Sequence, residues 1–379
     1  MASIPSGKEP QLAEDWNVQA QTPGFRIEPV NMLAQPKEVR LRCEITGAPA
    51  TIQMITPYIT LYFGSRHDAE LAWAGILYKI APLLGPIRSN PPVIGSEEER
   101  QRRQYTLDVS KRALIDLTKT EAANLLARGQ FSLSIPGALQ AMKLAKDVHG
   151  ENSIELVPTY LLLAEANLGL KRWKAAEEFL SLANWSVLNN PECSNSIRSQ
   201  LHRNFGKLYG AQGKHAEALQ QLSHDVYYAS LEVGPEHVDT AGGYYHMANI
   251  FYTQNEIENS LAFFDKVVDV WYKFLANVRN NNEDIDILGE AQISEALEML
   301  LKILKTRQKF LGDSHIATGE AHYTLGLLNL FVGDSEPAVD HITKASSIYE
   351  THLGSEHPST VDVNEVLSQL RNADIGQKK

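Results

Sequence analysis

The sequence predicts an all-α solenoid over residues 97–373, and three repeated features support this prediction. Small residues recur in the second helix of each apparent helix pair, at intervals of 42, 42, 42, 36 and 42, namely at Ser134, Ala176, Ala218, Ser260, Ala296 and Ala338. Twelve residues before four of these lie Ala164, Gly206, Ala248 and Gly326. A G-x-x-H turn recurs at 234–237, 312–315 and 354–357. Because self-similarity at a fixed period indicates a repeat architecture, about six helix pairs and a closing helix near 359–372 are expected.

Each repeated feature has a physical role in such an array. Two helices cross closely only where one side chain is small, and larger residues fill the space beside it. Such residues follow the small ones by four, at Leu180, Leu222, Phe264 and Ile342. A glycine after an apolar helix end favours a left-handed turn, and we expect three histidines to cap or pack these turns: His237, His315 and His357. The pattern is that of the tetratricopeptide (TPR) repeat, lengthened from 34 to 42 residues, and it resembles the repeats of kinesin light chains.

Two places mark where this array begins and where it is irregular. Ser96, followed three residues later by Glu99, has the capping-box pattern of a helix start. Between Phe264 and Ala296, the polar stretch Asn277–Asp284 interrupts the first helix expected there, which accounts for the 36-residue interval. Residues 374–379 are expected to form a tail.

The first 92 residues differ from the array in composition. Residues 1–38 contain five prolines without sustained periodicity, so an extended or disordered arm is expected. Within 39–92, strands are predicted at Val39–Ile45 and Tyr58–Phe63. A helix is predicted over 67–84, ending before Gly85-Pro86, and a linker follows at Asn90-Pro91-Pro92.

Composition and missing motifs narrow the possible functions. The chain has 379 residues and a formal net charge of −11, which argues against nucleic-acid binding because phosphate contacts need clustered Lys and Arg. Apolar stretches are too short for a membrane span. We find no nucleotide-binding, zinc-protease or nucleophile-elbow motif, so neither catalytic nor cofactor-binding residues are predicted. Cys193 lies in the turn NNPECSNS and is expected to be a small turn or packing residue.

Three segments then resemble a known family. They are NSIELVPTYLLLAEANLGL (152–170), LHRNFGKLYGAQGKHAEAL (201–219) and TAGGYYHMANIFY (240–252). These segments resemble the zinc finger MYND domain-containing protein 12 family, which joins an N-terminal MYND finger to TPR repeats. The resemblance is strong over 151–275, weaker but collinear over 39–150, and faint after 275. It implies a subunit of the motile-cilium axoneme that is associated with the single-headed inner-arm dynein d.

The resemblance also implies that residues 39–92 are a degenerate, MYND-like ββα segment without metal. MYND fingers need seven or eight Cys and His ligands, and here only Cys43 and His67 remain at ligand positions. Tetrahedral structural zinc needs four ligands, so no metal is predicted. The other ligand positions fall on Thr46, Met54, Pro57, Phe63, Leu77 and Ala81. The apolar residues among them are expected to fill the space that zinc would hold.

In a TPR array, the first helix of each pair lines the concave side, and the TPR positions map a partner-binding groove onto this chain. The mapped residues are Leu161, Glu165, Leu168, Arg203, Lys207, Tyr245, Asn249 and Tyr252, and farther along Tyr323, Leu327 and Leu330. Arg and Tyr are enriched at protein interfaces. For Leu161 and Leu168, packing against a neighbouring repeat is an equal alternative.

The repeats and the resemblance together predict a non-catalytic scaffold in the axoneme of the cilium or flagellum, and in the cytoplasm. It would dock or assemble inner dynein arm d on doublet microtubules. The implied partners are an inner-arm dynein heavy chain, its light chain and actin, a second TPR axonemal subunit and the doublet microtubule complex. The alternative is a cargo or motor adaptor resembling a kinesin light chain, although residues 1–96 contain no heptads for a coiled coil. An enzyme is a third hypothesis, because MYND fingers also occur beside SET methyltransferase domains, but the repeats occupy the length that such a domain needs.

Overall fold

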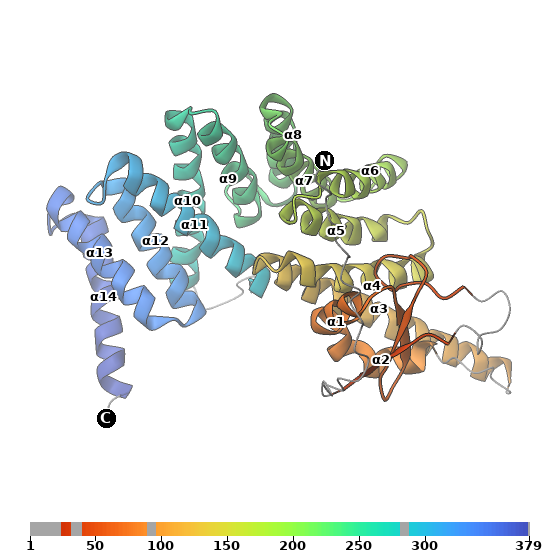
Figure 1. Cartoon of the computed structure of the whole chain (residues 1–379). Helices are drawn as coiled ribbons and strands as arrows, with labels where there is room; N and C mark the ends of the chain where they lie inside the picture. Colours follow the sequence, from red (N-terminus) through yellow and green to blue (C-terminus); the bar gives the residue numbers. More distant parts are fainter. Residues whose placement is uncertain (1–23, 32–39, 89–95, 281–287, 378–379) are drawn as a thin grey trace, which may run out of the picture. The chain divides into compact units, whose positions relative to one another are not determined.

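The computed structural model describes residues 24–31, 40–88, 96–280 and 288–377, and the chain divides into two compact units (Figure 1). The first, here called the N-terminal unit, comprises Met1–Trp73 and Leu77–Pro91. The second, here called the helical unit, comprises Ala74–Ile76 and Pro92–Lys379.

The N-terminal unit contains a three-stranded antiparallel sheet in the order β1-β2-β3. Its strands are β1 (Arg26–Pro29), β2 (Ile52–Ile55) and β3 (Thr60–Phe63). The strand predicted at Tyr58–Phe63 is therefore confirmed. The strand predicted at Val39–Ile45 is wrong in its described part, because residues 44–46 turn and only Arg42 forms a bridge, to Pro49. Strand β1 lies within the predicted arm, yet it pairs with β2, so this part of the arm belongs to the unit.

A helical segment follows the sheet, in three parts: α1 (Arg66–Ala72), a π-helical turn (Trp73–Leu77) and α2 (Tyr78–Arg88). The predicted helix end before Gly85-Pro86 is wrong, because α2 continues through both residues. Pro86 deprives the helix of one backbone hydrogen bond. Close packing compensates, since a Cβ on Gly85 would lie 2.7 Å from the carbonyl oxygen of Tyr58. Packing between α2 and the β2–β3 turn thus overrides the local helix-breaking signal.

The apolar residues at the former ligand positions lie inside the N-terminal unit. Met54, Phe63, Leu77 and Ala81 are all buried, as the resemblance led us to expect. Cys43 is also buried; its Sγ accepts a hydrogen bond from the backbone N–H of Thr46 and lies 3.9 Å from Oδ2 of Asp68. His67 is exposed. Apolar and sulfur-containing side chains therefore occupy the core of this unit.

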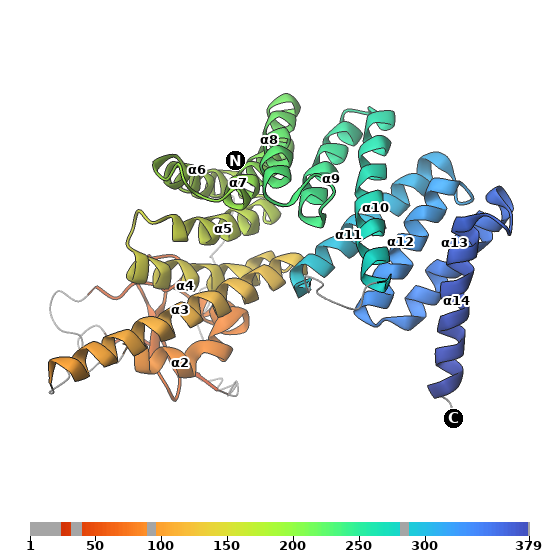
Figure 2. The same cartoon turned by 180° about the vertical axis from the view of Figure 1, so that it is seen from behind.

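The helical unit consists of successive antiparallel helix pairs, which Figure 2 shows from behind. Five pairs lie in the described residues: α3 (Glu97–Ala127) with α4 (Phe131–His149), α5 (Val157–Gly169) with α6 (Trp173–Asn189), α7 (Asn195–Ala211) with α8 (His215–Val233), α9 (Val238–Thr253) with α10 (Ile257–Asn280), and α12 (Ile316–Val332) with α13 (Ser335–Leu353). The helix α14 (Pro358–Gln377) closes the series, and a short 3-10 helix (Ile154–Leu156) precedes α5. The predicted capping box at the start of α3 is confirmed by reciprocal hydrogen bonds between Ser96 and Glu99.

Small and large residues interdigitate within the pairs as predicted. A Cβ on Gly206 of α7 would lie 2.6 Å from the side chain of Leu222 on α8. A Cβ on Gly326 of α12 would lie 2.4 Å from Ile342 on α13. Such distances are shorter than any real carbon–carbon contact, so only glycine allows these helices to approach so closely.

The G-x-x-H turns also take the predicted form. Gly234, Gly312 and Gly354 have φ values of 97°, 97° and 87°, which side chains rarely tolerate. The histidine of each turn stands just before the next helix. Its Nδ1 accepts a hydrogen bond from the backbone N–H two residues later, at 3.1 to 3.2 Å. The capping role predicted for His237, His315 and His357 is therefore confirmed.

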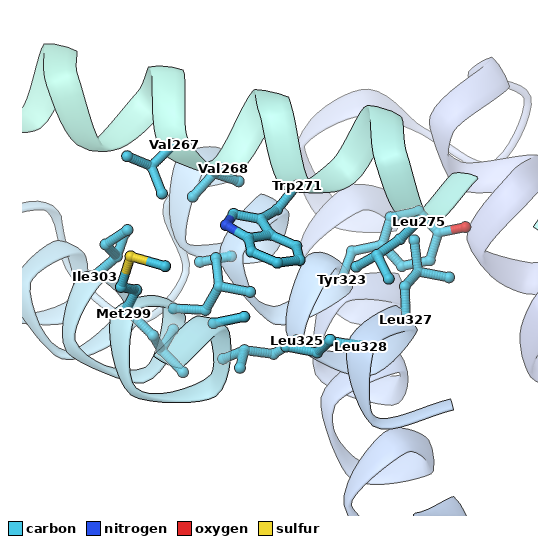
Figure 3. Close-up of a cluster of buried hydrophobic side chains, with 14 of the residues drawn as sticks. Val267, Val268, Trp271, Leu275, Met299, Ile303, Tyr323, Leu325, Leu327 and Leu328 are labelled. Carbon is cyan, nitrogen blue, oxygen red and sulfur yellow. The ribbon is translucent and has the colours of Figure 1, made fainter. Parts of the chain in front are cut away.

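The helix α11 (Glu290–Leu311) interrupts the pairing. The sequence predicts about six pairs, but α11 has no first helix of its own in the described residues. Instead, α10 extends to Asn280, past the predicted interruption at Asn277, and residues 281–287 lie outside the described range. Because one helix is missing, α10 packs directly on α12, with α11 beside both. Figure 3 shows this core: Trp271 of α10, Met299 and Ile303 of α11, and Leu325 and Leu328 of α12.

Candidate protein-binding surface

The first helices of three consecutive pairs, α5, α7 and α9, present residues at matching repeat positions. One position holds Leu161, Arg203 and Tyr245, and the next holds Glu165, Lys207 and Asn249, each 42 residues apart. We call these six residues the groove face. Since the same backbone positions are used three times, these side chains lie on one face of the array, with Leu161 and Tyr245 buried in it.

An ion pair between Arg203 and Asp225 lies at the centre of the groove face. The Asp225 carboxylate, on α8, is fully buried and accepts hydrogen bonds from Arg203 Nε at 2.8 Å and from Ser199 Oγ. Arg203 Nη2 also donates to the backbone oxygen of Asp239 at 2.7 Å. Burial acts to lower the pKa of Arg203, but the Asp225 carboxylate outweighs it and the pKa is raised. The guanidinium is therefore permanently charged and held in one position.

A second ion pair connects neighbouring repeats. Lys207 Nζ on α7 lies 2.6 Å from Glu165 Oε1 on α5, and the two side chains remain 22% and 35% exposed. Burial opposes both charges, but their mutual attraction lowers the pKa of Glu165 and raises the pKa of Lys207. Both groups are thus charged at neutral pH and partly accessible to solvent.

The helix α11 runs along α9 on this face, in the same direction. Gln292 Nε2 donates to Asp239 Oδ1 at 3.1 Å near the start of α9. Farther along, Lys302 lies over the ring of Tyr245, and Lys309 donates to the hydroxyl of Tyr252 at 3.1 Å. The groove face is therefore covered in part by a helix of the same chain.

A cavity of about 40 Å³ remains between α11 and the helices beneath it. It is lined by polar and apolar side chains, among them Arg203, Asp239, Trp271, Gln292 and Glu295. Trp271 Nε1 is buried and has no hydrogen-bond partner within the described residues. Such a volume accommodates two or three water-sized groups, since one needs roughly 10–15 Å³. The interior next to Arg203 is thus polar and incompletely filled.

Two further polar atoms on α9 lack partners in the part of the chain that the structure describes. They are Nε2 of His246 and Oδ1 of Asn249, both buried. Burial, followed by the charges of Lys207, Arg203 and Lys302, lowers the pKa of His246 well below its usual value. Its imidazole is therefore neutral at physiological pH.

The structure places the predicted groove residues in three environments. Arg203, Lys207 and Glu165 take part in the charged pairs, Tyr245 and Tyr252 lie beside α11, and Asn249 donates to the backbone oxygen of Tyr245 within α9. Leu161 is only 4% exposed, so the packing alternative holds for it, and Leu168 is half-buried. Tyr323 and Leu327, predicted farther along, lie in the core of Figure 3, and Leu330 is half-buried. The expectation of a groove there is wrong, because α10 covers that face of α12 where a helix is missing.

Sequence reasoning missed the acidic residues that complete this surface. Asp225 occupies the position that is Ala183 one repeat earlier and Val267 one repeat later. A carboxylate at a core position of a repeat is a signal that it pairs with a buried cation. Glu290 and Glu295 of α11 could not be placed, since no repeat equivalent shows that α11 lies on the groove face.

The described residues contain no group of three or more His, Cys, Asp or Glu side chains positioned to hold a metal ion. Cys193, in the turn before α7, accepts a hydrogen bond from Arg198 Nε at 3.4 Å. Within the same residues, no helix has both the length and the apolar character that crossing a membrane requires.

Comparison with known proteins agrees with the repeat architecture. Residues 291–351 match the tetratricopeptide repeat family. The clustered mitochondria protein homologs of Homo sapiens and Xenopus tropicalis are 21% and 22% identical over 174 and 175 residues, or 44% of this chain in each case. The matched region spans 13% of the length of these relatives.

Two solved structures are similar in part. The apo form of RapI has 13% identity and a TM-score of 0.37, over 69% of this chain and 72% of that one. A protein described as a kinesin light chain with nearly identical TPR-like repeats, from Podospora anserina, has 16% identity and a TM-score of 0.33, over 63% and 94%. The class that the repeats define is a TPR-type α-solenoid, an architecture that typically serves as a non-catalytic scaffold for protein–protein interaction.

Proposed function

We propose that this chain is a non-catalytic scaffold that binds another protein through the groove face of α5, α7 and α9. The observation that carries the proposal is the charged pair Lys207–Glu165, which remains partly exposed on a surface that repeats across three helix pairs. Residues buried only for stability are seldom charged. Partly exposed, positionally fixed charges are suited to selecting a partner by electrostatic complementarity.

The finer proposal concerns where this scaffold works. The resemblance to the zinc finger MYND domain-containing protein 12 family supports the axoneme of a motile cilium or flagellum. There the chain would dock or assemble the single-headed inner dynein arm d on doublet microtubules. Its partners would be the dynein heavy chain with its light chain and actin, and a second TPR subunit. The missing finger ligands do not affect this proposal, because the binding surface lies on the repeats.

The second candidate is a cargo or motor adaptor resembling a kinesin light chain. The 42-residue unit and its G-x-x-H turn favour it, because both features are shared with kinesin light chains. The two candidates differ in the motor that they contact, and this difference can be measured directly.

The test is capture from a high-salt axonemal extract with the purified, tagged full chain as bait. We expect enrichment of an inner-arm dynein heavy chain and actin, identified by mass spectrometry, and none of kinesin heavy chain. A matched variant, Glu165→Lys with Lys207→Glu, keeps the ion pair but reverses its direction, and it should recover about tenfold less dynein because charges in the interface then repel. Equal recovery by both baits would exclude the groove face, and a bait that enriches kinesin instead would support the second candidate.

A further inference from the structure

Aromatic and apolar side chains lie on the solvent-facing sides of α6 and α8, the second helices of neighbouring pairs (Figures 1 and 2). On α6, Leu182, Trp185 and Leu188 occupy successive turns and are 49%, 52% and 70% exposed. On α8, Tyr227 and Leu231 are each 57% exposed. Trp185 and Tyr227 are 42 residues apart, so they hold the same position in consecutive repeats and point in the same direction. We call these five residues the α6–α8 patch.

The repeat architecture does not require apolar residues at these positions. The position of Trp185 and Tyr227 holds Lys143 in α4, Asp269 in α10 and Ser347 in α13. The positions of Leu188 and Leu231 hold Lys146 and Asp147 in α4, Tyr272 and Lys273 in α10, and Glu350 and Thr351 in α13. Exposed apolar residues that gather in one place mark interaction sites. The α6–α8 patch is therefore a property of two repeats and not of the fold.

The surface around the patch is almost free of charge. Residues 179–190 contain no Asp, Glu, Lys or Arg, and within residues 218–231 the only such residue is Asp225. Asp225 is fully buried and paired with Arg203, so it does not reach this surface. The centres of protein–protein interfaces are likewise depleted in charge and enriched in Trp and Tyr.

We propose that the α6–α8 patch binds the same patch of a second copy of this chain and forms a two-fold symmetric dimer. In such an interface one surface serves both partners. The proposal goes beyond the scaffold function and does not depend on it, because the patch lies on second helices and the groove face lies on first helices. A dimer would carry two groove faces, and two linked binding sites hold a partner with two epitopes more strongly than one site does.

The charge of the chain favours a second copy as the occupant. Each copy has a formal net charge of −11, so two copies repel one another at long range and approach most easily where the surface is uncharged. Ser181, Asn189 and Ser223 are exposed and lie four residues from Trp185 or Tyr227. Hydroxyl and amide groups supply both donors and acceptors, so an identical surface can complement them across a two-fold axis. A border of like charges would instead repel its own copy.

The size of the patch suits the centre of a dimer interface. A whole aromatic side chain has about 150–250 Å² of surface, so the exposed parts of the five side chains amount to roughly 500 Å². A standard interface buries about 800 Å² on each partner. The patch would thus supply the apolar centre of such an interface, and the polar residues around it would supply the rest.

The aromatic side chain on α8 is already held in place. The ring of Tyr227 packs edge-on against the ring of Tyr228, with centroids 5.3 Å apart. Tyr228 in turn stacks on His202 of α7, with centroids 5.5 Å apart. A side chain that is ordered before binding loses little conformational entropy in the interface, so Tyr227 is suited to anchor a contact.

The test is sedimentation velocity of the purified full chain at concentrations from about 1 to 100 µM. We expect the wild type to shift from the chain mass of 42.2 kDa to twice that mass as the concentration rises. The variant Trp185→Lys with Leu188→Lys gives α6 the residues that α4 has at these positions, so the helix should fold, and circular dichroism checks this. It should dimerise at least tenfold more weakly, because like charges then face each other in the interface.

Two further variants make this test specific to the patch. Leu231→Lys gives α8 the residue that α10 has at the same position, and it should also weaken the dimer. The matched control is Val361→Lys, which changes a 51% exposed residue of α14 and should dimerise as the wild type does. A wild type that stays monomeric, or patch variants that dimerise as the wild type does, would overturn the proposal.

Salt and footprinting give independent readouts. Raising NaCl from about 50 to 500 mM should strengthen the dimer several-fold, because salt screens the repulsion between the two negative copies. Hydroxyl-radical footprinting should show Trp185 and Tyr227 becoming protected as the concentration rises, while Tyr105 of α3, which is 73% exposed, keeps its reactivity. A dimer that salt weakens, or one that leaves both patch residues reactive, would contradict the proposal. None of these measurements requires a dynein.

Discussion

Two parts of the helical unit use the same repeat for different purposes. In α5–α9 the helices alternate regularly, and the groove face keeps charged, partly exposed residues such as Arg203 and Lys207. In α10–α12 the described residues contain no first helix to pair with α11, and the corresponding face becomes hydrophobic core. Tyr323 and Leu327 illustrate the difference, because they occupy groove positions but are 3% and 4% exposed. Leu161 and Tyr245 of the regular part are also buried, at 4% and 8% exposure, so on the groove face it is mainly the charged side chains that remain accessible.

Both parts contain a buried arginine that is paired with an aspartate, and the two pairs differ in how far the aspartate is exposed to solvent. Asp225, the partner of Arg203, has a side chain with no exposed area, whereas Asp265, the partner of Arg307, is 58% exposed. Arg307 also has Glu320 at 3.8 Å and the carbonyl of Ala317. Arg203 thus has one fully buried carboxylate and one backbone carbonyl as partners, whereas Arg307 has two partly exposed carboxylates and one backbone carbonyl.

The largest expected effect comes from removing the buried carboxylate. Asp225→Ala leaves Arg203 charged without its main partner, and we expect a loss of about 3–5 kcal/mol in the free energy of unfolding. Asp265→Ala should lose only about 1 kcal/mol, because Asp265 itself is solvent-exposed and Arg307 keeps Glu320 and the carbonyl of Ala317 nearby. Urea unfolding followed by circular dichroism measures both values.

The double variant Arg203→Met, Asp225→Leu is the control for this prediction. It removes both charges and should restore most of the stability that Asp225→Ala loses. Equal losses in the two single variants would contradict the comparison between the regular and irregular parts.

A smaller effect is expected from a pair of histidines. His322 and His341, on α12 and α13, occupy the positions of His202 and Gln221 on α7 and α8, and their Nδ1 atoms lie 2.8 Å apart. Burial, followed by the charges of His341 and Lys344, lowers the pKa of His322 to about 4, although Asp340 and Asp313 oppose the shift. Between about pH 4 and 6.5, His322 therefore binds a proton in the unfolded chain but not in the folded chain.

Stability should thus fall as the pH decreases from about 6.5 to 4, by about 2 kcal/mol at pH 5. Above pH 6.5, His322 is neutral in both the folded and the unfolded chain, so no stability is lost to its protonation. His341→Gln recreates the pair found in α7 and α8, and it should reduce the loss by removing the neighbouring imidazole. Thermal unfolding at pH 7 and pH 5 gives the comparison, and a variant whose loss equals that of the wild type would contradict a role for His341.

The smallest effect concerns the helix caps, which the two parts share. His237→Ala before α9 and His315→Ala before α12 each remove a side-chain acceptor, and each should cost about 1 kcal/mol. Asparagine at either position should retain most of the stability, because its side chain can accept the same hydrogen bond. Calorimetry of the two alanine variants tests whether the caps are equivalent. A clear difference between the two losses of stability would show that the two caps are not equivalent.

Much of this fold could be predicted from the sequence. The 42-residue interval, the Gly206 and Gly326 crossings and the histidine caps all depend on local spacing, and the sequence displays spacing directly. The lone helix α11 could be predicted only in part. The interval of 36 residues before Ala296 marks an irregular repeat, but only packing shows that α11 has no partner helix among the described residues. The continuation of α2 through Gly85-Pro86 likewise depends on a tertiary contact with Tyr58.

The candidate site was partly predictable for a similar reason. Repeat positions located Arg203, Lys207 and Tyr245 on one face, because equivalent positions point in equivalent directions. They did not show that Asp225 pairs with Arg203, because Asp225 stands at a position that is apolar in the neighbouring repeats. They also could not show that Lys302 of α11 covers Tyr245, because α11 lies outside the regular pairing.

The contact between Arg128 and Glu290 has a consequence for how this protein can evolve. Repeat arrays commonly change length by gaining or losing whole units, since each unit touches only its neighbours. Here Glu290, at the start of α11, accepts a hydrogen bond from Arg128, just after α3 and 162 residues earlier, and a unit added between them would separate the two. Both side chains are about half exposed, and an exposed ion pair contributes little stability, so this contact disfavours added units between residues 128 and 290 only weakly.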